Sequence, residues 1–165
     1  MLIAAALQFL LALTYLLVPL AGHRYGAAAQ RAAEAEIRRQ GHETATLAKH
    51  GLNFTASTGS VLVSVAIALI LATLAVLNLG NQSLLTWVLQ PVLLIAGGFI
   101  TTAQVFVVRY VEAALRKSGT TNIDAKALIG AAAATFPRWF RPLVVTRFLL
   151  TTAGSLAILV LLAAS

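Results

Sequence analysis

Residues 59–108 read GSVLVSVAIALILATLAVLNLGNQSLLTWVLQPVLLIAGGFITTAQVFVV. The stretch contains two apolar blocks, each close to the length of about 20 residues that an α-helix needs to cross a bilayer. Only the short turn 80–83 separates the blocks, and so short a turn joins helices that run in opposite directions. The stretch therefore predicts an antiparallel hairpin of two membrane-spanning helices, at 59–79 and 84–108.

Two more apolar blocks, 2–21 and 143–164, flank this hairpin. No basic residue precedes the first block, which is also longer than the apolar core of a signal peptide, so we expect it to remain as a helix. Only 10% of the 165 residues are charged, whereas soluble chains carry roughly a quarter. The blocks are uninterrupted rather than alternating, which disfavours a β-barrel. The sequence thus predicts an all-α integral membrane protein, a single transmembrane domain built as an antiparallel bundle of four membrane-spanning helices.

The first long loop, 23–56, is expected to be partly helical. Its alanine-rich segment 27–40 predicts a surface helix that ends at Gly41. A second short helix is expected over 43–50, ending at Gly51 for the same reason.

The second long loop, 109–142, begins as a continuation of the third membrane helix through about Lys117, with a break expected at residues 118–119. Residues 121–124, Thr-Asn-Ile-Asp, have the pattern of a capping box and predict the start of another helix. Its apolar face would be formed by Leu128, Ile129, Ala132 and Ala133.

The charges predict the orientation of the chain in the membrane. The first loop holds five basic and three acidic residues, and residues 109–147 hold seven basic and two acidic ones, which accounts for the net charge of +7. Both chain ends and the turn 80–83 carry no charged side chain. Because positive charge is retained on the cytoplasmic side, both loops are expected in the cytoplasm and both termini outside a cell membrane.

Small and polar residues mark the faces along which helices pack in lipid. Each predicted span carries such a face, which favours a compact bundle. The expected packing residues are Ala5, Gln8, Ala12, Tyr15 and Pro19 in the first span, Ser57, Ser60, Ser64, Ala68 and Ala75 in the second, Gln90, Leu94, Gly97, Thr101 and Gln104 in the third, and Arg147, Thr151, Gly154, Ser155 and Ile158 in the fourth.

Arg147 is the charged residue within the predicted spans, four positions inside the fourth. In one interpretation its long side chain extends to the cytoplasmic interface, about 6 Å away. In the other, Gln104 accepts a hydrogen bond from it at the same depth, and Glu112 lies two turns further along that face. We treat Arg147, Gln104 and Glu112 as a candidate polar membrane cluster, either structural or able to bind an anion.

Residues 136–142 mix aromatic rings, arginines and prolines. Aromatic rings and cationic side chains are typical of the membrane–water interface. We therefore predict an interface anchor formed by Arg138, Trp139, Phe140 and Arg141, with anionic lipid headgroups as partners.

The remaining polar residues argue against several classes of function. No Asp, Glu or His lies in the predicted spans, which disfavours proton-coupled transport. Cysteine is absent and the only methionine is Met1, so thiolate and haem ligands at membrane depth are lacking. His23, His42 and His50 have no metal-site spacing. We expect no cofactor, no metal, no catalytic residue and no nucleic-acid partner.

Function is not written clearly in the sequence. The leading hypothesis is a non-catalytic membrane protein that works by association, as an accessory or structural subunit or as a homo-oligomer. The first alternative is a small oligomeric channel or facilitator for a small solute, in which Gln8, Gln90 and Gln104, with Thr101 and Thr102, line a polar path. The second alternative is a lipid-handling protein or an enzyme at the cytoplasmic interface.

Overall fold

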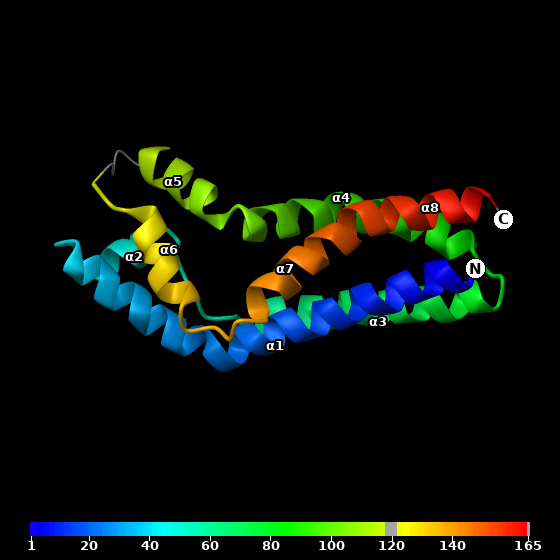
Figure 1. Ribbon diagram of the computed structural model, residues 1–165, viewed down its shortest axis with the longest axis horizontal. Helices are drawn as coiled ribbons and strands as arrows, with labels where there is room; N and C mark the ends of the chain where they lie inside the picture. Colours follow the sequence, from blue (N-terminus) through cyan, green and yellow to red (C-terminus); the bar gives the residue numbers. More distant parts are fainter. Residues whose placement is uncertain (118–121, 165) are drawn as a thin grey trace.

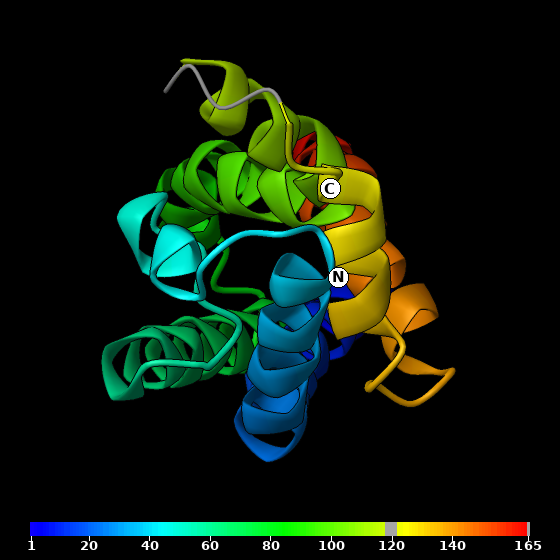
Figure 2. The same ribbon diagram turned by 90° about the vertical axis from the view of Figure 1, so that its left-hand side faces the viewer.

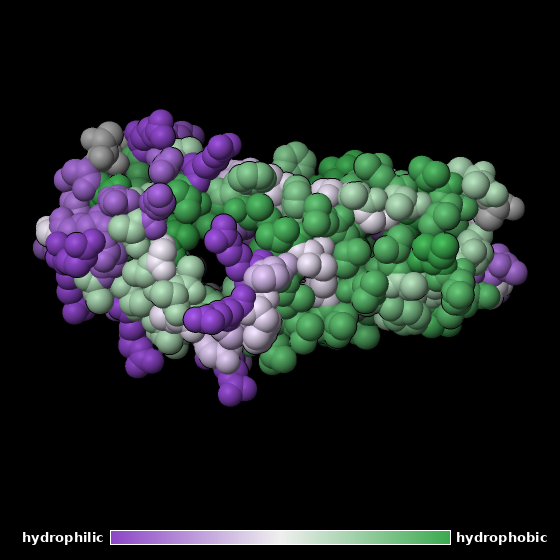
Figure 3. Space-filling view, in the orientation of Figure 1, coloured by the Kyte–Doolittle hydropathy of each residue, from purple (hydrophilic) through white to green (hydrophobic). Residues whose placement is uncertain are grey.

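The computed structural model describes residues 1–117 and 122–164, in which all regular elements are helices and there is no strand. Four helices are long and apolar enough to cross a membrane: α1, α3, α4 and the continuous helix Phe140–Ala163. Apolar side chains cover one end of the elongated molecule and hydrophilic ones cover the other (Figures 1 and 3). The elements are α1 (Leu2–Arg39), α2 (Ala45–Lys49), α3 (Thr58–Leu79), α4 (Leu84–Val105), α5 (Val107–Lys117), α6 (Ala125–Ala133), α7 (Phe140–Leu149), the π-helical segment η1 (Leu150–Gly154) and α8 (Ser155–Ala163).

Helix α1 is one continuous helix, whereas the sequence predicted a span at 2–21 and a separate surface helix at 27–40. The alanine-rich segment has high helix propensity, so nothing ends the helix at the boundary of the apolar block. Figure 1 shows α1 bending where it leaves the apolar bundle. The predicted stop at Gly41 is confirmed, because Gly41 has a φ of 81° and the backbone N–H of His42 donates to the carbonyl of Ile37.

The apolar bundle is organised around α1. Helix α1 packs along α3 and also contacts α7, η1 and α8, while α4 packs against α7, η1 and α8. Helices α3 and α4 contact each other only slightly, although the short turn 80–83 joins them. They lie apart in both ribbon views (Figures 1 and 2). The close pairing expected of a hairpin is therefore replaced by packing of each helix against α1 or the last helix.

The opposite end of the molecule, here called the head, comprises residues 23–57, 106–117 and 122–139. It contains α2, α5, α6 and the C-terminal half of α1. It has a hydrophobic core of its own. The alanines of the first predicted loop, such as Ala29 and Ala33, are buried in this core rather than exposed to water. The buried core residues are Ala29, Ala33, Ile37, Leu47, Val111, Leu115, Ile123, Ala125, Leu128 and Ala132.

The third span is shorter than predicted. Helix α4 ends at Val105 and α5 begins at Val107, so the chain departs from helical geometry at Phe106 rather than continuing to Lys117. Helix α5 is amphipathic and buries Val111 and Leu115 in the head, which a straight continuation of α4 would not place there. The break expected at 118–119 lies outside the described residues.

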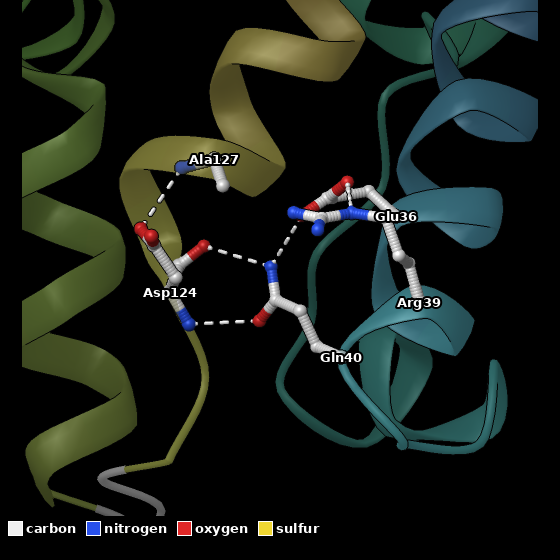
Figure 4. A network of polar contacts seen from close by, with 5 residues as sticks. All are labelled: Glu36, Arg39, Gln40, Asp124 and Ala127. Atoms are coloured by element: carbon white, nitrogen blue, oxygen red, sulfur yellow. Dashed lines mark hydrogen bonds and ion pairs between the residues drawn. The ribbon is translucent and has the colours of Figure 1, made fainter.

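A polar junction joins the end of α1 to the start of α6 (Figure 4). The N-cap of α6 is Asp124, whose side chain accepts a hydrogen bond from the N–H of Ala127 at 2.9 Å. The start of the predicted capping box, Thr121, lies outside the described residues. The side-chain amide of Gln40 accepts from the backbone N–H of Asp124 at 2.8 Å and donates to its carbonyl at 3.3 Å. Gln40 thus ties α6 to α1.

Glu36 orients this glutamine, because its carboxylate accepts from the amide of Gln40 at 2.8 Å. Arg39 donates two further hydrogen bonds to Glu36, at 2.7 and 2.8 Å. These donors, Arg39 first and Gln40 second, lower the pKa of Glu36 to about 2.

We expect acid to weaken this junction. The ordinary pKa of the Glu36 carboxyl is 4.5 and the folded value is about 2, so its contribution is complete above pH 4.5 and is lost as the pH falls towards 2. Thermal unfolding in neutral detergent should show a melting temperature that falls more steeply for the wild type than for Glu36→Gln between about pH 5 and about pH 3. Parallel curves for the two proteins would contradict this prediction.

Candidate functional site

A layer of polar side chains lies inside the apolar bundle near the two chain ends. Gln8 comes from α1, Asn78 from α3, Thr86 and Gln90 from α4, and Ser155 from α8. All five side chains are fully buried, at 0% exposure. Every membrane-length helix therefore contributes to this buried layer.

The five side chains form one chain of hydrogen bonds. Thr86 donates to the Asn78 amide oxygen at 3.1 Å, and Asn78 donates to the Gln8 oxygen at 2.8 Å. Gln8 then donates to the Gln90 oxygen at 3.1 Å, and Gln90 donates to the Ser155 hydroxyl at 2.8 Å. Each amide has both its oxygen and its nitrogen satisfied by a neighbouring helix, as a buried polar group requires. The layer closes the interior of the bundle at this depth.

The sequence identified only part of this layer. Gln8 and Gln90 were candidates for a polar path or for interhelical bonding, and the structure places them in contact with each other. Asn78 and Thr86 were missed. For Asn78 a signal existed, because it follows the correctly predicted Ala75 by three residues and so shares its helical face.

The predicted packing faces are confirmed for most of the first, third and fourth spans, but Gln104 at the end of the third is exposed, and the prediction is wrong for the first turns of α3. Ser57 and Ser60 are exposed, and Ser64 is only half-buried. Packing of α3 is instead concentrated towards its C-terminal end. The buried residues of that helix are Ala68, Leu71, Leu74, Ala75 and Asn78.

Arg147 forms a second polar layer nearer the head. Its side chain is only 2% exposed, so the interpretation in which it reaches the aqueous interface is wrong. A terminal nitrogen of the guanidinium donates to the amide oxygen of Gln104. The guanidinium carbon lies 5.0 Å from the centre of the Tyr15 ring, a cation–π geometry. Among the described residues, its Nε is the buried side-chain nitrogen left without a hydrogen-bond partner.

The third member of the predicted polar cluster lies elsewhere. Glu112 accepts from Arg116, one turn along α5, at 3.4 Å. Of the residues that the structure describes, the acids in ion pairs are Glu36 and Glu112, and neither is paired with Arg147. Arg147 is thus held by a neutral amide and an aromatic ring, without a carboxylate.

The two polar layers are separated by a close helix contact at Gly97. A Cβ atom at this position would lie 2.7 Å from the Tyr15 hydroxyl and 2.8 Å from a methyl carbon of Thr151, so only glycine fits. Thr151 lies in the π-helical segment that follows α7. Its hydroxyl donates to the backbone carbonyl of Arg147, in α7, at 2.7 Å. Such π-helical insertions widen a helix locally and are frequent at functional sites.

The predicted interface anchor lies where the chain passes from the head into α7. The rings of Phe136 and Phe140 stack with centres 4.3 Å apart, and Tyr25 of α1 lies 6.0 Å from Phe136. The Trp139 side chain is 51% exposed, and Arg138 and Arg141 are also exposed. Phe140 packs against Phe136, so the exposed members of the predicted anchor are Trp139 and the two arginines.

No protein-family profile matches the chain, and comparison with curated protein sequences and with solved structures found no significant match. The described residues also contain no group of three or more His, Cys, Asp or Glu side chains placed to hold a metal. Function therefore has to be inferred from the residues and their contacts.

We expect the buried polar layer to stabilise the bundle. Gln90→Met keeps the approximate size of the side chain and removes its hydrogen bonds to Gln8 and Ser155. Interhelical polar bonds in membranes average about 0.6 kcal/mol, so the loss should be about 1 kcal/mol in unfolding free energy. Thr73→Val is the control, because Thr73 is exposed and bonds only to its own helix. Equal stability of the two variants would argue against a stabilising layer.

Proposed function

We propose that this protein is a non-catalytic membrane protein that works by association, as a subunit of a membrane assembly. The proposal rests on a contrast between two parts of the bundle. Its interior is filled by hydrogen-bonded side chains, whereas much of the apolar surface of α3 and α4 is not covered by other helices. The fully buried, mutually satisfied layer around Gln8 and Gln90 leaves no polar path through the bundle at that depth. The surfaces that remain available are those facing outward.

The outward faces of α3 and α4, which lie apart from each other, each have the composition of a helix–helix contact. These two helices bury only 22% of their most apolar stretches, against 44% for α1. Gly98 has no atom within 4 Å of the place where a Cβ would stand, and Ser60 is exposed. Small residues of this kind allow another helix to approach closely in lipid. A second copy of the chain or a partner subunit would supply that helix.

The orientation proposed for the membrane follows from charge. The head carries most of the basic residues, including the exposed Arg138, and the exposed Arg141 follows it at the start of α7. Both chain ends lie at the opposite end of the molecule, together with the turn 80–83 (Figure 1). The positive-inside rule supports a cytoplasmic head that rests on anionic headgroups, with both termini on the outer face.

Single cysteines test this orientation, because the chain has none of its own. Ala35→Cys and Lys126→Cys place exposed thiols on the head, and Gln82→Cys places one on the turn at the other end. In intact cells a membrane-impermeant maleimide should label position 82 alone, and lysis should expose all three. Labelling of position 35 or 126 before lysis would reverse the proposed topology.

The two neighbouring glycines separate folding from association. Gly97→Leu should lower the melting temperature, because its side chain meets Tyr15 and Thr151. Gly98→Leu should leave the melting temperature of the subunit unchanged and block close approach of another helix. Native mass spectrometry of gently solubilised protein should therefore show a defined assembly for the wild type and its loss in Gly98→Leu.

The same spectra identify the kind of assembly. A single mass multiple of the chain supports a homo-oligomer, and a reproducible second polypeptide supports an accessory subunit. A wild-type protein that is monomeric and alone, or a Gly98→Leu variant that assembles normally, would contradict association through the outward face of α4.

A further inference from the structure

Arg147 is a buried charge for which the described chain offers no counter-charge. Its partners are neutral, the amide oxygen of Gln104 and the ring of Tyr15. Its Nε donor finds no hydrogen-bond acceptor among the residues that the structure describes. A buried cation at membrane depth is expensive unless an anion or several good acceptors compensate it. Arg147 is thus under-compensated.

The acidic residues do not fill this role. Glu36 and Glu112 are bound to the arginines of their own helices, Arg39 and Arg116. Asp124 caps α6, and Glu34 accepts from Gln30 on α1. The fifth acid, Glu43, is exposed beside α2 in the head. A counter-ion for Arg147 therefore has to come from outside the chain.

An external anion needs a route to the Arg147 side chain. Figure 3 shows a hollow with a hydrophilic rim between the head and the bundle, in the region where α7 rises from the head towards the end of α4 (Figure 1). Gln104 lies in the last turn of α4 and is exposed, so its side chain can move aside. Arg109, Arg138 and Arg141 are also exposed.

We propose that Arg147 is the innermost donor of a binding site for the phosphate group of an anionic lipid. The phosphate displaces the Gln104 oxygen and accepts from the free Nε and a terminal nitrogen of Arg147 together, the bidentate geometry that guanidinium groups favour. The exposed Arg109, Arg138 and Arg141 attract the negatively charged headgroup towards the site.

The apolar surroundings favour a lipid as the source of this phosphate. Arg147 lies seven residues into a membrane-length helix, about 10 Å from its start. Phe106 at the end of α4, two residues after Gln104, is 42% exposed. An acyl chain can lie along this side chain while the headgroup reaches the guanidinium. Free phosphate has no part that could use this apolar contact.

The test uses the full-length protein in neutral detergent, with its melting temperature measured after adding one probe. The probes are dioleoyl phosphatidic acid, dioleoyl phosphatidylcholine and inorganic phosphate. Arg147→Leu removes the proposed donor, and Arg38→Gln is the control, because it removes one exposed arginine at the far end of α1 that has no part in the proposed site. Lipid adducts counted by native mass spectrometry give a second readout that does not depend on stability.

We expect phosphatidic acid to stabilise the wild type and Arg38→Gln, and to have little effect on Arg147→Leu. Loss of a charge-assisted bidentate contact should weaken lipid binding at least about tenfold. Phosphatidylcholine and inorganic phosphate should have little effect on any of the proteins. Inorganic phosphate acting as strongly as phosphatidic acid would overturn the lipid as source and leave a free-anion site.

Gln104→Glu separates binding from a purely structural role. It places a carboxylate of the same size opposite Arg147, so it should raise the melting temperature without lipid and abolish the effect of phosphatidic acid. If Arg147 only holds helices together, Gln104→Glu will raise the melting temperature while the lipid effect stays as in the wild type. That outcome, or equal lipid stabilisation of the wild type and Arg147→Leu, would overturn the proposal.

Discussion

The hydrogen bond between Gln8 and Gln90 and its extensions to Asn78 and Ser155 set the arrangement of the bundle. In lipid the hydrophobic effect does not drive apolar helices together, so their rotation about their own axes is weakly determined. A polar amide left in hydrocarbon costs several kcal/mol, and this cost decides which face of each helix turns inward. The same bonds explain why α1 lies between α3 and the last helix, since Gln8 is the residue that bridges Asn78 and Gln90.

Once that layer is formed, the rest of the membrane-length helices follow in register. Tyr15 lies seven residues after Gln8, and Gly97 lies seven residues after Gln90, so each pair shares a helical face. The two faces therefore meet again at the Gly97 contact, where the Tyr15 hydroxyl would touch a Cβ. Gln104 lies a further seven residues along α4 and meets Arg147. The position of the buried Arg147 guanidinium thus depends on the pairing of Gln8 with Gln90, two seven-residue steps earlier along α4.

Packing in the head depends on a different driving force. Its core of alanine, leucine and isoleucine side chains is of the kind that water drives together, and its polar junction at Gln40 joins segments 84 residues apart in sequence. Continuous α1 runs through both the apolar bundle and the head, which couples the rotation fixed by Gln8 to the surface that α6 packs against. Arg147 lies in α7, between the bundle and the head, and this location supports its proposed role towards a phosphate headgroup.

The sequence by itself determined the all-helical class, four membrane-length helices, the glycine stops after α1 and α2, and most of the inward faces. These properties depend on local composition and periodicity, which a single chain displays directly. The tertiary structure decided what depends on distant partners. It joined the first span to the surface helix, separated α3 from α4, broke the third helix at Phe106, and brought Asn78 and Thr86 into the buried layer. It also placed Glu112 beside Arg116 rather than Arg147, because α5 turns into the head to bury Val111 and Leu115.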